Sequence, residues 1–413
     1  MERLRLRAPA ALSLLLLLLT AGAVRAQVPT SSALSSSSSI LADPEFQAAA
    51  KKGLDALYDM DFAVADSVFN ELALRYPDHP VSPFLRGLLP WWAMQLEPDD
   101  TSQDETFLAA MDEVIDRCDR RLKTHPGDID SLFFKSGALA FRGRLHSDRR
   151  HYLKAARDGK QALGYLRDVL ARDPGNDDLY FGIGLFDYLA DVVPKRYRIL
   201  RPFALFFPKG NRQRGLAELD RAMTRGRFAS TETAYSLLQI QYIFEQNYPE
   251  ALKMVRWLRQ RHPGNSLFHL YEGRIDERLG WTGEASRVFE EILSLCQKGQ
   301  TGYTDAIEEQ ALYVLSRVEM QNNHHSVALA YLERLETLNV KRPVSTEYRS
   351  LARLRRGMAL DALGRRAEAV RCYREALAMN GPDFVDDKAK VFLKKPYRGE
   401  WVAPPTAVTT ARR

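Results

Sequence analysis

The sequence of 413 residues has few of the residues from which metal and disulfide sites are built. It contains three cysteines, Cys118, Cys296 and Cys372, which lie far apart and form no Cys-x-x-Cys pair. An odd and sparse set of this kind argues against a disulfide framework and against a cysteine-rich zinc site. Cys118 and Cys372 fall on apolar helical stripes, so we expect them to be buried thiols.

The patterns of known catalytic machinery are also missing. The sequence has no His-Glu-x-x-His, Gly-x-Ser-x-Gly, Walker or Gly-x-Gly-x-x-Gly pattern. His146 and His151 lie beside Arg149 and Arg150, and a neighbouring cation disfavours a bound metal ion. We therefore expect no catalytic residues, no cofactor, no metal site and no enzymatic activity.

The chain has little excess charge. The formal net charge is +6, and the first 26 residues account for half of it through four arginines set against Glu2. The remaining charge of about +3 is too small to indicate nucleic-acid binding. We expect no nucleic-acid partner.

Long apolar runs are confined to the first residues. Arg3, Arg5 and Arg7 precede the apolar run Ala11–Val24, and a small residue, Ala26, closes the segment. This order is typical of a secretory signal peptide, residues 1–26, cleaved after Ala26. The alternative is an uncleaved membrane anchor, but the run of about 14 residues is short of the ~20 that a spanning helix needs. We therefore expect an exported protein, periplasmic or secreted, with envelope association left open.

The strongest pattern in the sequence is a repeat of fixed length. Two segments of 34 residues lie end to end between Glu232 and Gly299. The first places Tyr235, Leu238, Tyr242, Ala251 and Leu258 at offsets 4, 7, 11, 20 and 27, and the second places Gly273, Gly280, Ala285, Phe289 and Ile292 at offsets 8, 15, 20, 24 and 27. Small residues at offsets 8 and 20 would let two helices approach closely, and large residues would fill the space beside them. The pattern resembles the tetratricopeptide repeat (TPR), a pair of antiparallel helices.

Weaker copies of the same pattern extend over residues 45–383. The turns between them contain Pro, Gly and Asn or Asp, as in His125-Pro126-Gly127-Asp128, which end one helix and cap the next. Two copies depart from the pattern through predicted insertions, one of them over Gly143–Ala155. We predict an all-α fold, a TPR-like right-handed α-solenoid of about eight helix pairs, because a single pair cannot bury both of its faces. A serine-rich flexible leader, residues 27–44, would precede it, and a helical cap with a disordered tail, residues 384–413, would follow.

The least ordinary stretch within the repeats is residues 192–217. It carries seven basic residues, including Arg196, Arg198 and Arg201, no acidic residue between them, and an apolar cluster at 203–207. The glycine-rich run Gly182–Phe186, the proline-broken apolar insert and the run Gly210–Leu216 that follows the insert resemble the eukaryotic TPR family of Iml2 and tetratricopeptide repeat protein 39, over about residues 180–225. Three interpretations stay open: binding to an acidic peptide, docking onto anionic lipid headgroups, or packing against the solenoid with the arginines solvated.

Since the TPR family builds its concave surface from the first helix of each pair, the resemblance predicts groove residues. Gln239, Tyr242, His269 and Arg274 are the candidates for binding a partner, and we expect Gln239, His269 and Arg274 to be exposed. The predicted function is a non-enzymatic protein–protein interaction scaffold of the cell envelope that binds a peptide or protein in its groove. The alternative is a membrane-associated TPR protein that docks through residues 192–217.

Overall fold

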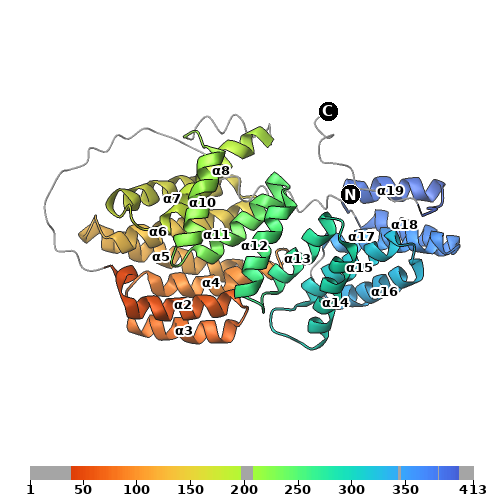
Figure 1. Ribbon diagram of the computed structural model, residues 1–413, viewed down its shortest axis with the longest axis horizontal. Helices are drawn as coiled ribbons and strands as arrows, with labels where there is room; N and C mark the ends of the chain where they lie inside the picture. The colour runs from red at the N-terminus through yellow and green to blue at the C-terminus, as the bar shows by residue number, and fades with distance from the viewer. Residues whose placement is uncertain (1–38, 197–207, 343–345, 380, 400–413) are drawn as a thin grey trace. The chain divides into compact units, whose positions relative to one another are not determined.

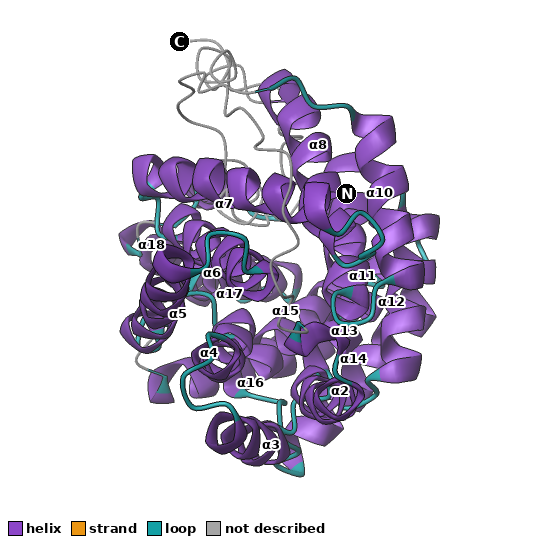
Figure 2. Ribbon diagram, turned by 90° about the vertical axis from the view of Figure 1, so that its left-hand side faces the viewer, coloured by secondary structure: helices purple, strands orange, loops and turns teal. Residues whose placement is uncertain are grey.

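The structure is a computed structural model that describes residues 39–196, 208–342, 346–379 and 381–399. Helices make up most of this part, and none of the described residues lies in a strand (Figure 2). The predicted all-α, TPR-like fold class is confirmed. Eight helix pairs follow one another along the described chain, and α19 comes after the last of them (Figure 1).

The first four pairs occupy the N-terminal half of the chain. They are α2 (Pro44–Tyr58) with α3 (Phe62–Arg75), α4 (Val81–Leu96) with α5 (Asp104–Thr124), α6 (Ile129–Asp148) with α7 (Tyr152–Arg172), and α8 (Leu179–Arg196) with α10 (Arg212–Arg225). A short 3₁₀ helix, η1 (Ile40–Ala42), precedes α2.

The other pairs occupy the C-terminal half. They are α11 (Ser230–Gln239), continued by the π-helical η3 (Ile240–Glu245), with α12 (Tyr248–Arg261); α13 (Ser266–Arg278) with α14 (Thr282–Gln297); α15 (Asp305–Gln321) with α16 (His325–Lys341); and α17 (Glu347–Ala362) with α18 (Arg366–Ala378). The final helix, α19 (Asp383–Lys394), is longer than the short cap that the sequence predicts.

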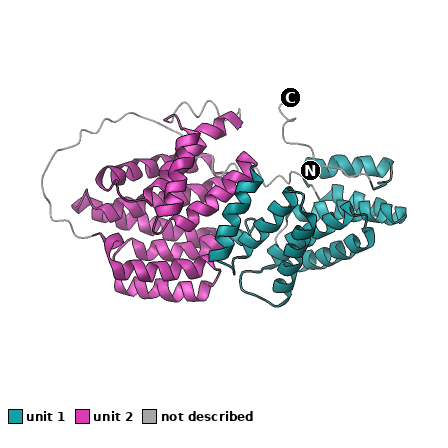
Figure 3. Cartoon of the chain, viewed as in Figure 1, with its two compact units in different colours: residues 1–5, 94–101, 247–413 teal, residues 6–93, 102–246 magenta. Residues whose placement is uncertain are grey.

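The chain divides into two compact units (Figure 3). Of the described residues, those in 39–93 and 102–246 belong to unit 2, and those in 94–101 and 247–399 belong to unit 1. The boundary at Gln246 falls inside the fifth helix pair, between η3 and α12. The predicted limits of the repeat domain at residues 45 and 383 stay a prediction.

Small and large residues meet inside the pairs as the repeat predicts. A Cβ atom added to Gly273 of α13 would lie 2.9 Å from the Phe289 ring of α14, and one added to Gly357 of α17 would lie 2.5 Å from the Tyr373 ring of α18. Both rings are fully buried. Each glycine therefore admits an aromatic ring whose burial contributes about 1.5–3 kcal/mol.

The turns contain the helix caps that the sequence predicts. Asp128 accepts a hydrogen bond from the backbone N–H of Ser131 at 3.2 Å, at the start of α6. Asn265 accepts from the N–H groups of Leu267 and Phe268 at 3.1 Å, at the start of α13. These side chains satisfy N–H groups that the first turn of a helix leaves without a partner.

The third pair contains no insertion, so that prediction is wrong. The residues assigned to it lengthen both helices, and a tight turn with Arg150 at φ 62° joins them. The helices stay close because Gly143 lies against α7, where an added Cβ would be 3.3 Å from the backbone oxygen of Ala155. An extension of a helix pair therefore looks like an insertion when only the spacing of the repeat is known.

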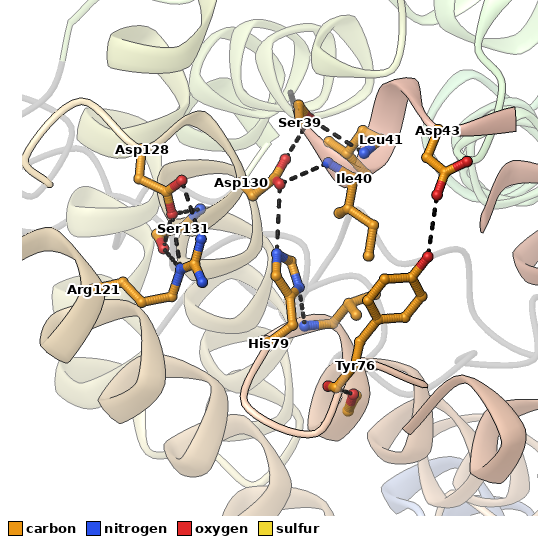
Figure 4. Close-up of polar contacts among 12 residues, drawn as sticks. Ser39, Ile40, Leu41, Asp43, Tyr76, His79, Arg121, Asp128, Asp130 and Ser131 are labelled. Carbon is orange, nitrogen blue, oxygen red and sulfur yellow. Dashed lines mark hydrogen bonds and ion pairs between the residues drawn. The ribbon is translucent and has the colours of Figure 1, made fainter. Parts of the chain in front are cut away.

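The last residues of the predicted flexible leader are held in place. Ile40 donates its backbone N–H to Asp130 at 2.8 Å, and Ser39 donates its hydroxyl to the same carboxylate (Figure 4). The His79 ring lies on the other side of Asp130, with its Nε2 3.4 Å from the carboxylate. We call residues 39–43 the strap. The first 38 residues, with the predicted signal peptide, lie outside the described part of the chain.

Candidate functional site

Unit 2 encloses a cavity of ≈ 210 Å³. Its wall is formed by side chains of η1, α2, α4, α6, α7, α8 and α11 and of the turn before α11, and nearly all of them are apolar. Phenylalanines dominate, and those that line the cavity are Phe46, Phe84, Phe133, Phe134, Phe141, Phe181, Phe186 and Phe228. Among the described residues that line it there is no lysine, arginine or histidine.

Several wall residues are only half-buried. Phe84, Phe133, Phe141, Phe181 and Phe228 keep part of their surface accessible, although each lines the cavity. The rings of Phe84 and Phe141 meet edge to face with centroids 5.9 Å apart, a geometry that stabilises aromatic pairs. The cavity therefore has an accessible aromatic margin as well as a buried interior.

Glycines on the first helices of the pairs bring the walls together. An added Cβ at Gly182 of α8 would lie 2.6 Å from Leu166 of α7, and one at Gly137 of α6 would lie 3.1 Å from the Phe84 ring of α4. Both glycines line the cavity. Larger residues at these positions would displace the neighbouring side chains and change the shape of the cavity.

One acidic side chain in the wall, Glu232 of α11, is almost completely buried, with 8% of its surface exposed. Its Oε1 accepts a hydrogen bond from the indole N–H of Trp92 at 2.9 Å. Burial raises the pKa of Glu232 to about 7, against the opposing effects of the Arg144 guanidinium and of the Trp92 hydrogen bond. This carboxyl therefore exchanges its proton near neutral pH.

A second acidic residue of the wall, Asp178, has a different environment. It accepts hydrogen bonds from the backbone N–H groups of Phe228 at 2.9 Å and Ala229 at 2.8 Å, and so holds the turn that precedes α11. Burial raises its pKa, which those hydrogen bonds oppose. Burial, followed by the charge of Glu232, raises the pKa of the wall residue Tyr58. Asp178 is thus a structural residue of the wall.

The strap completes one side of the cavity, because Leu41 is part of the lining. The backbone oxygen of Leu41 accepts hydrogen bonds from the Gln47 amide at 2.7 Å and from the Arg227 guanidinium at 3.3 Å. Asp43 accepts a hydrogen bond from the Tyr76 hydroxyl at 3.1 Å (Figure 4). The strap is therefore attached at several points on unit 2.

The four predicted groove residues are buried, so the expected exposure of Gln239, His269 and Arg274 is wrong. Gln239 and Tyr242 belong to unit 2, and Gln239 accepts a long hydrogen bond of 3.5 Å from Arg144. Their role in binding a partner stays a prediction.

The other two predicted residues belong to unit 1. His269 lies 2.9 Å from the Tyr303 hydroxyl, and burial, followed by the charge of Arg259, lowers its pKa to about 3. Arg274 donates to the Tyr348 hydroxyl at 3.0 Å. Both side chains therefore take part in the packing of unit 1.

The basic stretch 192–217 is described only in part, and Arg198 and Arg201 lie outside the described residues. Arg196 donates to the backbone oxygen of Phe244 at 3.1 Å. Arg212 pairs with Glu245, and Arg214 pairs with Asp187. These three arginines therefore have partners within unit 2.

Sequence reasoning did not find Glu232 as part of a site or the cavity. The signal for Glu232 was an acidic residue among the buried positions of a first helix, and the signal for the cavity was the high frequency of phenylalanine in α6 and α8. The thiols of Cys118 and Cys372 are buried as predicted. Among the described residues, no group of His, Cys, Asp or Glu is arranged to hold a metal ion, and no helix is long and apolar enough to cross a membrane.

Two family models match the chain. The model of Iml2/Tetratricopeptide repeat protein 39 matches residues 178–341, and a tetratricopeptide repeat model matches residues 352–383. The first match includes residues 180–225, the region in which the sequence pattern resembles the same family. No curated protein matches the chain.

Solved structures with a similar arrangement are distant in sequence. NprR in complex with its cognate peptide NprX is 13% identical, with 85% of this chain and 83% of that chain covered and a TM-score of 0.36. The human IFIT1 dimer with m7Gppp-AAAA is 13% identical, with 86% of each chain covered and a TM-score of 0.44. A tetratricopeptide repeat protein from Parabacteroides merdae is 13% identical, with 84% of this chain and 97% of that chain covered and a TM-score of 0.29.

Because these TM-scores are low, the assignment depends on the family models and on the helix pairs themselves. The recurring glycine-to-aromatic contacts and the capped turns agree with both models. The chain has the helix-pair fold of tetratricopeptide repeat proteins and resembles them: residues 178–341 match the family of Iml2 and tetratricopeptide repeat protein 39, and residues 352–383 match a tetratricopeptide repeat.

Proposed function

We propose that this protein is a non-catalytic interaction scaffold whose unit 2 binds an apolar segment of a protein partner in the cavity. The observation that supports the proposal is the apolar space of ≈ 210 Å³ with an accessible aromatic margin. A pocket that is mostly apolar and has few polar groups is typical of a binding site. TPR proteins as a class act as scaffolds for protein interactions, which agrees with this use.

The size of the cavity suits side chains better than a whole helix. An engineered cavity of roughly 150 Å³ with an apolar lining binds benzene, so this one accommodates one or two apolar side chains. Each contributes about 1.5–3 kcal/mol when it is fully buried. After the cost of ordering the peptide, we expect micromolar affinity for a short segment.

We further propose that the protein is exported and acts in the cell envelope. The support is the order of basic, apolar and small residues in 1–26. Binding of the partner would then take place in the periplasm or outside the cell.

A library of displayed peptides tests the binding proposal. The chain from Gln27 onward should enrich peptides with large apolar side chains. Ala140→Phe, which places a ring in the cavity, should abolish the enrichment. Ala63→Phe, which makes the same change at an exposed position of α3, should preserve it.

Circular dichroism and thermal unfolding of both variants establish that they fold. If a folded Ala140→Phe protein enriches the same peptides as the wild type, the cavity is not the binding site. If the wild type enriches no apolar peptides, the proposal itself is wrong.

A further inference from the structure

One carboxylate oxygen in the cavity wall, Oε2 of Glu232, has no hydrogen-bond partner among the described residues. Glu232 has only 8% of its surface exposed. Its Oε1 accepts a hydrogen bond from the indole N–H of Trp92. Among the described residues, Oε2 has no hydrogen-bond partner and Glu232 forms no ion pair. Oε2 is not fully buried, and Glu232 lines the cavity, so a donor inside the cavity can reach this oxygen.

The charged and titratable groups around Glu232 do not supply that partner. Arg144 of α6 is close enough to lower the pKa of Glu232, but its guanidinium is bonded to Gln239 and lies over the Trp91 ring at 5.1 Å. The phenol of Tyr58 of α2 lies near the carboxylates of Glu232 and Asp178, whose charges add to the effect of burial and raise its pKa. Asp178 adds a second acidic group to a wall whose described residues include no lysine, arginine or histidine.

The remaining lining restricts what can approach Glu232. Apart from Tyr58, Ser136, Asp178 and Glu232, each lining residue in the described part of the chain has an apolar side chain or is glycine. An occupant therefore contacts hydrocarbon along most of its length and meets negative charge at one place. A carboxylate-bearing occupant would meet two acidic residues, and their negative charge disfavours its ionised form.

We propose that the partner segment carries a lysine whose ammonium group binds Oε2 of Glu232, while its methylene chain and neighbouring apolar side chains fill the cavity. This inference rests on the proposed function, since it names the chemistry of the segment that the cavity takes. A lysine fits both parts of the site, because its four methylene groups bury well along apolar surface and its ammonium supplies three donors. A hydrogen bond to a charged group contributes about 1.5–3 kcal/mol.

Three six-carbon probes that differ only in their head group test the inference. We would measure the binding of n-hexylamine, 1-hexanol and hexanoate to the chain from Gln27 onward by calorimetry at pH 8. Hexylamine ends in the same ammonium as lysine, and we expect it to bind roughly tenfold more tightly than hexanol. Hexanoate should bind most weakly.

Glu232→Gln keeps the shape of the side chain and removes its charge. We expect this variant to bind hexanol as the wild type does and to lose the tenfold preference for hexylamine. Glu105→Gln, an exposed position of α5, is the matched control and should keep the preference. If Glu232→Gln does not fold, the binding of hexylamine and hexanol to the wild type at pH 6 and at pH 8 provides a second measurement.

The preference for hexylamine should shrink at pH 6, because protonation removes the charge of Glu232, whereas hexylamine stays protonated. If hexylamine binds no better than hexanol at pH 8, or if the preference is the same at pH 6 and in Glu232→Gln, the inference is wrong and apolar binding stands. If none of the probes binds and no apolar peptides are enriched, the proposed function itself fails.

In peptides that the library selects, replacing the lysine by methionine should weaken binding by a similar factor.

Discussion

At the scale of single residues, the protein keeps an ionisable group in an apolar environment. Trp92 supplies one hydrogen bond to Glu232, and the rings of Tyr58 and Tyr235 pack around Trp92 with centroid distances of 5.3 and 5.5 Å. The cluster exposes little polar surface, so water cannot solvate the carboxylate well. The folded state therefore favours the protonated form of Glu232.

This preference makes stability depend on pH. The pKa of Glu232 rises from an ordinary value of 4.5 to about 7. An acidic group whose pKa is higher in the folded protein than in the unfolded protein stabilises the fold. This contribution is complete below the pKa of the unfolded protein and is lost as the pH rises through the pKa of the folded protein. Relative to Glu232→Gln, the free energy of unfolding of the wild type should fall by roughly 3 kcal/mol between pH 4.5 and pH 7.5.

Urea unfolding of both proteins over this pH range measures the difference. Glu105→Gln serves as the control and should follow the wild type at every pH. Curves of wild type and Glu232→Gln that stay parallel would show that Glu232 does not titrate in this window.

At the scale of secondary-structure elements, close approach of paired helices depends on glycine. Gly53 of α2 is buried, and an added Cβ would overlap the Phe69 ring of α3. We expect Gly53→Ala to destabilise the protein by about 1–3 kcal/mol, because the ring is fully buried and cannot move freely.

Gly164 provides a matched control in the same unit. It lies in the middle of α7, and an added Cβ would meet nothing within 4 Å. Gly164→Ala should stabilise the protein by about 0.5–1 kcal/mol, since alanine favours the helix. Chemical denaturation measures both values, and two variants of equal stability would contradict the proposed packing.

The strap is the element that links the N-terminal segment to the cavity. Asp130 holds Ser39 and the backbone N–H of Ile40, and Leu41 lines the cavity. In Asp130→Ala the amide of Ile40 loses its acceptor, so its hydrogen exchange should accelerate by roughly tenfold or more. The exposed residue Asp116 of α5 provides the control variant Asp116→Ala. Unchanged exchange at Ile40 in Asp130→Ala would mean that the strap is held by its other contacts.

At the scale of the whole molecule, the first 26 residues bear on where the protein acts. If they are a cleaved signal peptide, the exported protein should begin at Gln27 and lack the leucine run that precedes it. Intact-mass and N-terminal sequence measurements on the protein from its native source test this. A product that retains Leu14–Leu19 would instead indicate an anchored protein.

Much of the local architecture could be predicted from spacing. Ala65 and Phe69 of α3 stand opposite Gly53 of α2 because the helical period places their side chains on facing sides of a pair. The burial of the candidate residues could not be predicted in the same way. Gln239 and His269 occupy inner-face positions that the repeat pattern leaves undefined, and neighbouring pairs cover them.

The sequence alone determined that this protein consists of paired amphipathic helices with capped turns, because those features follow from interactions between residues close in the chain. Only the tertiary structure decided where a cavity forms and which polar group lies in its wall. Leu41, Phe133 and Glu232 are distant in the chain and line the same space. The physical reason is that burial, and with it the pKa of Glu232, depends on how side chains from six helices fill the volume between them.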